Sequence, residues 1–288
     1  MKEQASSTGR LYIVPTPIGN LEDITLRALR LLGEVERILA EDTRRTRILL
    51  DHHAIRTPVS HFDDHNAERL IPGIRAALIG GARLALVSDA GTPGISDPGG
   101  ALVRAVREMV PVEALPGASA LTTAISGSGL PGERFVFEGF LPRKGAERRA
   151  RLESLLRETR TVSFFESPQR LAATLAELTA LGAGERGAIV ARELTKIYET
   201  YHRGTVAELS AWFQAEPPRG EIVVLLEGAV FSPPGDEEIG QWLDEALGRG
   251  VGVKEAARGV AARSGRPASE LYALALLRRG DKSPQSYY

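Results

Sequence analysis

The sequence predicts an α/β protein built from two α/β domains that share one ligand cleft, with a small helical module towards the C-terminal end. Short apolar strands alternate with amphipathic helices along most of the chain. Loops rich in glycine and proline follow several of these strands, at the position where open α/β sheets bind ligands. The chain has 288 residues, which is enough for two domains of ordinary size.

The first predicted domain covers residues 10–126, and residues 1–9 are expected to form a disordered leader. The apolar patterns place its strands at 10–14, 35–42, 57–62, 84–89 and 112–115, and its helices at 21–34, 43–54, 66–81 and 101–110. Parallel strands need crossover connections, which are usually helices. This alternation therefore predicts a parallel sheet that is covered on both faces.

The second predicted domain covers residues 133–230 and repeats the alternation after a glycine-rich hinge at 125–135. Its expected strands are 135–141, 161–167, 187–195, 197–204 and 221–229, and its expected helices are 146–159, 169–181 and 206–213. A linker at 231–238 then leads to three helical patterns within 236–280. The last two of these resemble a helix-turn-helix pair.

Composition and charge exclude several classes of protein. The 36 Lys and Arg residues balance the 37 Asp and Glu residues, so the chain lacks the positive excess of a protein that coats nucleic acid without specificity. Two local basic runs, at 141–160 and 249–282, still raise the case for an anionic polymer as substrate. The absence of cysteine excludes disulfides, thiolate metal sites and thiol catalysis. No secretion signal or membrane-length apolar run is apparent, so we expect a cytoplasmic protein.

Common cofactor motifs are absent or out of place. The string GSGLPG at 127–132 fits the dinucleotide fingerprint by letter, but it follows a helix and contains Pro131, which indicates a linker. The string HFDDH at 61–65 could ligate a metal, yet a loop with Asp63 or Asp64 as a helix cap fits it better, and we expect no metal. Neither a P-loop nor a G-x-S-x-G elbow occurs.

What remains is a set of polar and glycine-rich segments at strand ends in both halves of the chain. They are TPIGN (16–20), AEDTRRT (40–46), SDAGTPGISDPG (88–99), LPGASA (115–120), FFESPQR (164–170) and ARELTK (191–196). Glycines in such loops allow the backbone to approach a ligand closely, and the prolines stiffen it. We therefore expect a shaped loop at 88–99 and one cleft between the two domains.

Six motifs in this order resemble the tetrapyrrole methylase superfamily: VPTPIGNLEDIT, AEDTRRT, SDAGTPGISDPG, PGASALTTA, FEGFLPRK and FFESPQRL. More narrowly, the chain resembles the ribosomal RNA small subunit methyltransferase I family over about residues 10–230, and its terminal helices resemble that family's helix-turn-helix extension. The resemblance implies a homodimeric methyltransferase that uses S-adenosylmethionine (SAM). The implied product is a 2′-O-methylated cytidine in the decoding region of 16S rRNA in the small ribosomal subunit.

The resemblance also implies that SAM lies folded in the cleft between the two domains. Carried over by motif, the expected cofactor contacts are Pro17, Ile18, Gly19, Asp89, Gly91, Thr92, Ile95, Ser96, Ser119, Ala120, Phe165, Ala191, Arg192 and Ile222. Ser119 is equally suited to cap the helix that follows it.

Methyl transfer needs an aligned ribose hydroxyl and an acceptor for its proton. The candidate bases are Asp42, Glu166, Glu193 and Lys196, and nothing in the sequence ranks them. Lys196 qualifies only if its pKa is lowered. Glu166 could instead cap a helix, and Asp42 could instead pair with Arg44 or Arg45.

The expected rRNA phosphate contacts are Arg44, Arg45, Arg143, Lys144 and Lys196. The helical module is expected to contact RNA or the ribosome, although its apolar positions would also suit packing. Two alternatives stay open. One is a methyltransferase of the same fold that acts on a tetrapyrrole or in diphthamide synthesis. The other is a noncatalytic RNA-binding ribosome-assembly factor.

Overall fold

The computed structural model describes residues 9–230 and 235–280, and these fall into two compact units that divide between Ala229 and Val230. Most of the predicted leader (1–9) and half of the predicted linker (231–238) lie outside the described residues. The last part of that linker was predicted wrongly, because helix α9 already begins at Asp236.

The first sheet confirms the parallel arrangement that the strand–helix alternation predicts. Its five strands run in the order β3-β2-β4-β1-β5, and all neighbours are parallel. Their bounds are β1 (Arg10–Val14), β2 (Arg37–Ala40), β3 (Val59–His61), β4 (Arg83–Val87) and β5 (Val112–Ala114). Parallel strands align their carboxyl ends at one edge, so the loops after β1, β2, β4 and β5 meet there.

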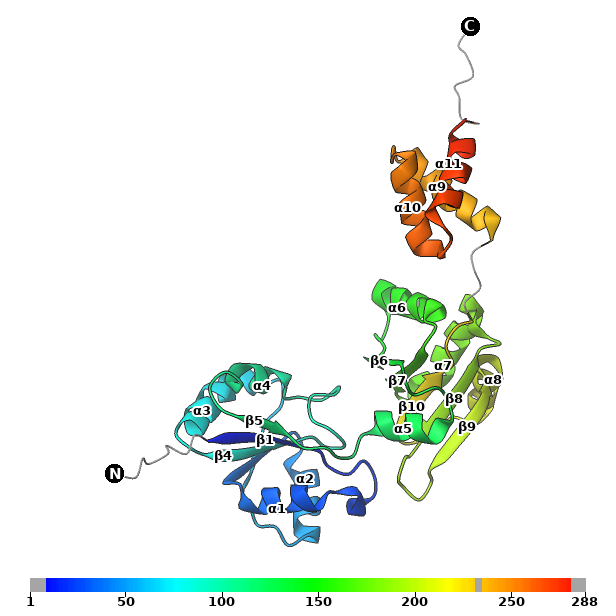
Figure 1. The fold of residues 1–288 in the computed structure, drawn as a ribbon. Coiled ribbons are helices and arrows are strands. Elements are labelled where there is room, and N and C mark those ends of the chain that lie inside the picture. The colour runs from blue at the N-terminus through cyan, green and yellow to red at the C-terminus, as the bar shows by residue number, and fades with distance from the viewer. Residues whose placement is uncertain (1–8, 231–234, 281–288) are drawn as a thin grey trace. The chain divides into compact units, whose positions relative to one another are not determined.

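Helices cover both faces of this sheet (Figure 1). Alternate residues of β1 divide between two cores: Tyr12 and Val14 pack with helices α1 and α2, and Leu11 and Ile13 pack with α3 and α4. The helices are α1 (Leu26–Glu34), α2 (Thr43–His52), α3 (Ala67–Ile79) and α4 (Gly100–Val106).

The second sheet is mixed rather than parallel. Its order is β6-β7-β10-β8-β9, and only the β6–β7 pair is parallel. The strands are β6 (Phe135–Phe140), β7 (Thr161–Glu166), β8 (Gly187–Arg192), β9 (Thr200–Thr205) and β10 (Ile222–Leu226). Since β10 is antiparallel to both neighbours, its first residue, Ile222, pairs with the last residues of β7 and β8, Glu166 and Arg192.

One face of the second sheet packs against helices α6 (Gly145–Arg157), α7 (Pro168–Leu178) and α8 (Val206–Ala215), and the other packs against α5 (Ala120–Ser128). Ala124 and Ile125 of α5 lie in the same core as Val223 and Leu225 of β10. The hinge predicted at 125–135 therefore overlaps a packed helix up to Ser128. Its glycines lie at and beyond the helix end, where Gly129 adopts a left-handed conformation.

The second compact unit contains helices α9 (Asp236–Gly248), α10 (Val253–Ser264) and α11 (Ala268–Gly280). They enclose a small core of their own around Ile239, Leu243 and Leu271, which are fully buried. The Arg263 guanidinium lies 3.5 Å from the centre of the Trp242 ring, a cation–π contact that links α10 to α9.

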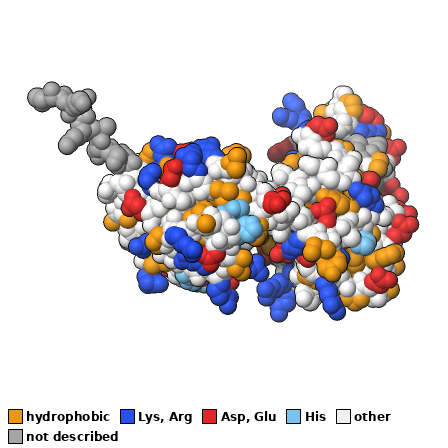
Figure 2. All heavy atoms as spheres, turned by 90° about the horizontal axis from the view of Figure 1, so that it is seen from below, with side chains coloured by type: hydrophobic (Ala, Val, Ile, Leu, Met, Phe, Trp, Pro, Cys, Tyr) orange, Lys and Arg blue, Asp and Glu red, His pale blue; other side chains and the backbone are white. Residues whose placement is uncertain are grey.

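Charge of both signs is spread over the surface. On the face that Figure 2 shows, Lys and Arg side chains lie interspersed with Asp and Glu, as the net charge of −1 suggests. Among the described residues, no helix is both long and apolar enough to cross a membrane.

Candidate active site

The loop at 88–99 is held in a defined shape, as its prolines and glycines predict. Gly91, whose φ of 85° suits glycine, exchanges two backbone hydrogen bonds of 2.9 Å with Thr16 in the loop after β1. The Ser88 hydroxyl donates to the carbonyl of Gly91 (2.9 Å), and the Thr92 hydroxyl donates to that of Ala118 (3.1 Å). Three strand-end loops of the first sheet are thereby fixed to one another.

The segment after β2 joins the same assembly. The backbone N–H of Asp42 donates to Oδ1 of Asp89 over 2.8 Å, and the Asp42 carboxylate caps α2 by accepting from the N–H of Arg44. Asp42 thus connects the loop after β4 to the basic start of α2.

The first and second halves of the chain meet at the edge of this assembly. The N–H of Asn20 donates to the Thr195 hydroxyl over 3.1 Å. At Gly19, a Cβ would lie only 2.5 Å from Cγ of Lys196 and 2.8 Å from the carbonyl of Leu194, so glycine permits this close approach.

A cavity of about 350 Å³ lies between these loops and the strand ends of the second sheet. From the first half of the chain it is lined by Ile18, Arg45, Asp89, Ala90, Gly91, Thr92, Ile95, Ser96, Asp97, Ser119 and Ala120. From the second half it is lined by Phe140, Phe165, Glu166, Ser167, Pro168, Leu194, Gly220, Glu221, Ile222 and Val223. Loops and strand ends that are far apart in the sequence therefore build one site, with an apolar wall and several carboxylates.

Most of the expected cofactor contacts line this cavity. They are Ile18, Asp89, Gly91, Thr92, Ile95, Ser96, Ser119, Ala120, Phe165 and Ile222. Four expected contacts are not among its lining residues: Pro17, Gly19, Ala191 and Arg192. Ala191 is fully buried in the core of the second sheet. The Arg192 guanidinium donates to the carbonyls of Arg219 and Tyr198. That any of these residues binds a cofactor stays a prediction.

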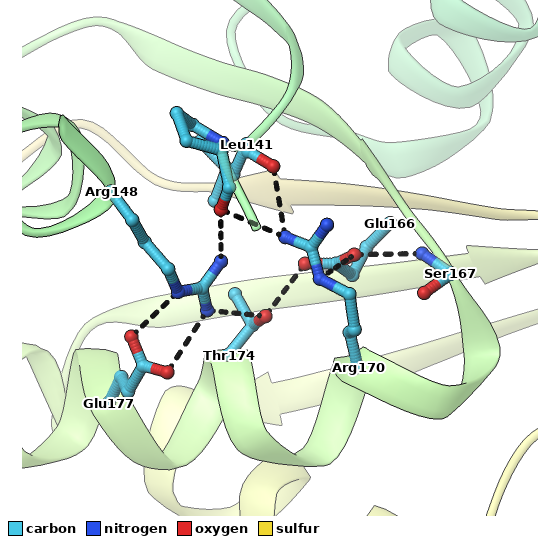
Figure 3. A network of polar contacts seen from close by, with 8 residues as sticks. Leu141, Arg148, Glu166, Ser167, Arg170, Thr174 and Glu177 are labelled. Atoms are coloured by element: carbon cyan, nitrogen blue, oxygen red, sulfur yellow. Dashed lines mark hydrogen bonds and ion pairs between the residues drawn. The ribbon is translucent and has the colours of Figure 1, made fainter. Parts of the chain in front are cut away.

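Glu166, a candidate base, is held in a buried polar network (Figure 3). Its carboxylate accepts from the Thr174 hydroxyl (2.6 Å) and from the N–H of Ser167 (2.8 Å), and it pairs with Arg170 over 3.3 Å. The Glu166 side chain is 0% exposed. Its oxygens already have partners, so its position fits a structural role at the start of α7.

The same network fixes the chain between β6 and α6. Arg148, which is buried, donates to Glu177, to the Thr174 hydroxyl and to the carbonyl of Pro142. Arg170 donates to the carbonyls of Leu141 and Pro142 (Figure 3). These bonds hold the loop that carries Arg143 and Lys144, directly after the cavity-lining Phe140.

The other three candidate bases are also engaged. Hydrogen bonds from the Arg44 side chain and backbone lower the pKa of Asp42 to about 2. The backbone N–H of Glu221 and the Lys196 ammonium lower the pKa of Glu193. Burial lowers the pKa of Lys196, but hydrogen bonds to Glu193 (2.9 Å) and Glu221 (3.0 Å) outweigh it, so the net pKa is raised. A lysine with a raised pKa stays protonated and is a poor base.

Asp97, like Glu221, is a cavity carboxylate that the sequence analysis did not single out. Burial, together with the negative charges of Glu41 and Asp89, raises its pKa to about 7. A carboxylate inside the glycine- and proline-rich loop was the available signal. Its environment depends on Glu41, which follows a different strand.

The expected RNA contacts differ in whether an ion pair engages their side chains. Arg44 is exposed but paired with Asp42, and Lys196 lies between Glu193 and Glu221. Arg45 is exposed and lines the cavity, and no ion pair engages its side chain among residues 9–230 and 235–280. Arg143 and Lys144 are exposed as well. Of the five expected RNA contacts, Arg45, Arg143 and Lys144 are therefore the ones without an ion pair among the described residues.

The segment HFDDH begins at the last residue of β3 and continues into the loop before α3, whose N-cap position is Asn66 rather than the expected Asp63 or Asp64. Asp63 and Asn66 exchange side-chain-to-backbone hydrogen bonds of 2.8 and 3.1 Å, and His61 lies 3.1 Å from both Asp63 and Asn66. Within the described residues, no group of three or more His, Cys, Asp or Glu side chains is placed to hold a metal ion.

Known proteins resemble this chain over most of its length. Residues 10–210 match the family of tetrapyrrole (corrin/porphyrin) methylases. A ribosomal RNA small subunit methyltransferase I from Thermotoga maritima is 50% identical over 221 residues, which make up 76% of this chain and 99% of that protein. The protein of that name from Pseudomonas aeruginosa is 44% identical over 281 residues, 95% of this chain and 99% of its own length.

Among solved structures, uroporphyrin-III C-methyltransferase from Thermus thermophilus, complexed with S-adenosylhomocysteine, has the same fold. It superposes with a TM-score of 0.55 at 23% identity and covers 75% of this chain and 97% of its own. The two sheets, the cavity at their strand ends and these relatives lead to one assignment. This chain belongs to the ribosomal RNA small subunit methyltransferase I family of the tetrapyrrole methylases.

Proposed function

We propose that this chain transfers a methyl group from SAM to the 2′-hydroxyl of a cytidine in the decoding region of 16S rRNA. The observation that carries this proposal is the cavity between the two sheets, in a chain whose relatives are named as small-subunit rRNA methyltransferases. SAM supplies a methyl group that its sulfonium already activates. The protein then has to hold the cofactor, align the ribose and accept one proton.

The composition of the cavity suits this cofactor. SAM combines a flat adenine, a ribose and a cationic sulfonium with a charged amino acid. Phe165 stacks at a tilt with Phe140 in the cavity wall, 5.4 Å between ring centres, and offers an apolar surface for the adenine. Asp89 supplies negative charge for the cationic part, and backbone groups of the loop 88–99 would contact the polar atoms.

The free cations suit RNA. Arg45 lies in the cavity lining, and the buried network holds the loop carrying Arg143 and Lys144 next to Phe140. Phosphate groups bound there would bring a ribose to the cavity mouth. Arg148, Arg149 and Arg151 pair with Glu177, Glu153 and Glu138, so they fit structural roles better than RNA contact.

The resemblance further supports a homodimer that acts in the cytoplasm. Size-exclusion chromatography with light scattering would measure the oligomeric state.

The competing proposal is methyl transfer to a tetrapyrrole or a diphthamide-type substrate. The solved enzymes that act on such substrates resemble this chain in fold. The decisive comparison offers the enzyme unmethylated small subunits, naked 16S rRNA and uroporphyrinogen in parallel, each with labelled SAM. Label in the rRNA alone supports the proposal, and label in the porphyrinoid alone rejects it. SAM binding without transfer to any substrate favours a noncatalytic role.

A further inference from the structure

We propose that Asp97 is the proton acceptor for the ribose hydroxyl, a role that rests on the proposed function of this site. Asp97 lies in the cavity lining, on the loop that joins β4 to α4. No hydrogen bond or ion pair engages its carboxyl group within the described residues, so its oxygens are free to accept a proton from a ligand.

The other candidate acceptors are occupied. Glu166 is buried under three donors, and Asp42 is held by Arg44. Glu193 accepts from Lys196 and from the N–H of Glu221. A base that must first break two or three charge-assisted hydrogen bonds loses much of its driving force. Asp97 carries no such cost.

The backbone places Asp97 in a built position rather than in a loose loop. The preceding residue, Ser96, has a φ of 59°, an uncommon conformation for a residue with a side chain. Its hydroxyl lies 3.2 Å from the point that a Cβ on Gly139 of β6 would occupy. The loop therefore reaches the second sheet at this point, on the side where Phe140 lines the cavity.

The charges around Asp97 tune it for proton transfer at neutral pH. Burial is the largest cause of its raised pKa of about 7, followed by Glu41 after β2 and Asp89 after β4. The remaining ionisable groups of the cavity are Arg45 on α2, Glu166 at the end of β7 and Glu221 before β10. A general base is most efficient when its pKa lies near the working pH.

The proposed step moves one proton and one methyl group. The hydroxyl proton passes to a carboxylate oxygen of Asp97 while the ribose oxygen uses a lone pair to bond the methyl carbon. The electron pair of the breaking carbon–sulfur bond stays on sulfur, which leaves a neutral thioether. Protonated Asp97 then returns its proton to water, and no other reactant is needed.

The test is a pH–rate profile with unmethylated small subunits as substrate and labelled SAM. For the wild type, kcat/KM for SAM should rise with pH to a plateau, with a midpoint near 7, because Asp97 must be deprotonated. The midpoint of the kcat profile should lie at lower pH than that of kcat/KM, because the bound sulfonium cation stabilises the carboxylate form of Asp97. Asp97→Asn should lower kcat at least about 100-fold, while calorimetry finds SAM affinity within a few-fold of wild type.

A matched variant is Glu41→Gln, which removes a charge that raises the Asp97 pKa at a residue that does not itself line the cavity. Its kcat at pH 8.5 should match the wild type, and its kcat/KM midpoint should move to lower pH. The inference is overturned if kcat of Asp97→Asn stays within a few-fold of the wild type, or if this variant loses SAM affinity as strongly as it loses rate. It is also overturned if the kcat/KM midpoint of Glu41→Gln does not move. If the wild type itself makes no methylated cytidine, the proposed function fails, and the role of Asp97 fails with it.

Discussion

The Thr174 hydroxyl donates a hydrogen bond of 2.6 Å to Oε2 of Glu166, and both residues are almost completely excluded from solvent. The bond joins the middle of α7 to the end of β7, where the cavity begins. A buried carboxylate needs such donors, because leaving a charge unpaired in the interior is costly.

Thr174→Val should lower the free energy of unfolding by about 1–3 kcal/mol, because it removes one donor from a buried carboxylate and keeps the side-chain shape. Urea denaturation followed by circular dichroism measures this. Thr122→Val is the control: Thr122 is exposed on α5, and its substitution should change stability by less than about 0.5 kcal/mol. Equal effects of the two variants would contradict the structural role of the Glu166 network.

Asp97→Asn should stabilise the protein at high pH. The folded-state pKa of about 7 lies above the reference value of 3.8, so the folded state holds a proton that the unfolded state has released between these values. The wild type therefore loses stability as pH rises from about 4 through 7, and the asparagine variant avoids this loss. Because Asp97 is partly exposed, we expect a gain of only about 1–2 kcal/mol at pH 8 after solvent screening is considered.

Thermal unfolding at pH 4.5 and pH 8, without cofactor, checks this difference. Asp23→Asn, at an exposed position away from these carboxylates, serves as the control and should behave like the wild type at both pH values. If Asp97→Asn is no more stable relative to the wild type at pH 8 than at pH 4.5, then burial and the charges of Glu41 and Asp89 do not raise the Asp97 pKa as described.

Arg45→Ala should weaken RNA binding more than Arg44→Ala. The Arg45 side chain lines the cavity, whereas the Arg44 guanidinium is bound to the Asp42 carboxylate. Loss of one phosphate contact should reduce the slope of log K against log salt concentration by about 0.7–0.9 for Arg45→Ala and by less for Arg44→Ala. Both variants, and the double variant, should bind SAM as the wild type does.

Titrations of 16S rRNA at several salt concentrations, with calorimetry for SAM, measure both properties. A parallel loss of RNA and SAM affinity in Arg45→Ala would mean that this arginine contacts the cofactor instead.

Removal of the helical module, residues 236–288, should raise KM for small subunits about 10-fold and leave SAM binding intact. The Thermotoga maritima relative is matched over 99% of its length by 76% of this chain, so part of this chain has no counterpart there. The first unit also has complete cores of its own. Steady-state kinetics at saturating SAM test the expectation, and an unchanged KM would indicate that the module serves another purpose.

The sequence predicted the parallel first sheet well because the information for it is local. Strand–helix alternation specifies a parallel sheet, and the carboxyl ends of parallel strands place the loops after β1, β2, β4 and β5 together. That logic also brings together the residues that line the cavity from the first half of the chain. Pattern alone could not show that β10 inserts antiparallel between β7 and β8, because strand pairing depends on contacts between distant segments.

The choice among proton acceptors was also beyond the sequence. Glu166 and Asp97 both follow or lie near strand ends in polar motifs, and they look equivalent in a string of letters. Their difference arises from the folded environment: Thr174 and Arg170 of α7 donate to Glu166. By contrast, Asp89 and the sequence-remote Glu41 repel the charge of Asp97.

The proposed methyl transfer is tested most directly by incubating this protein with SAM and small ribosomal subunits that lack the modification, followed by nuclease digestion and mass spectrometry of the rRNA. We expect one 2′-O-methylated cytidine, at a single decoding-region position, with near-stoichiometric yield. Unmodified rRNA, from an enzyme that still binds SAM tightly in calorimetry, would contradict it.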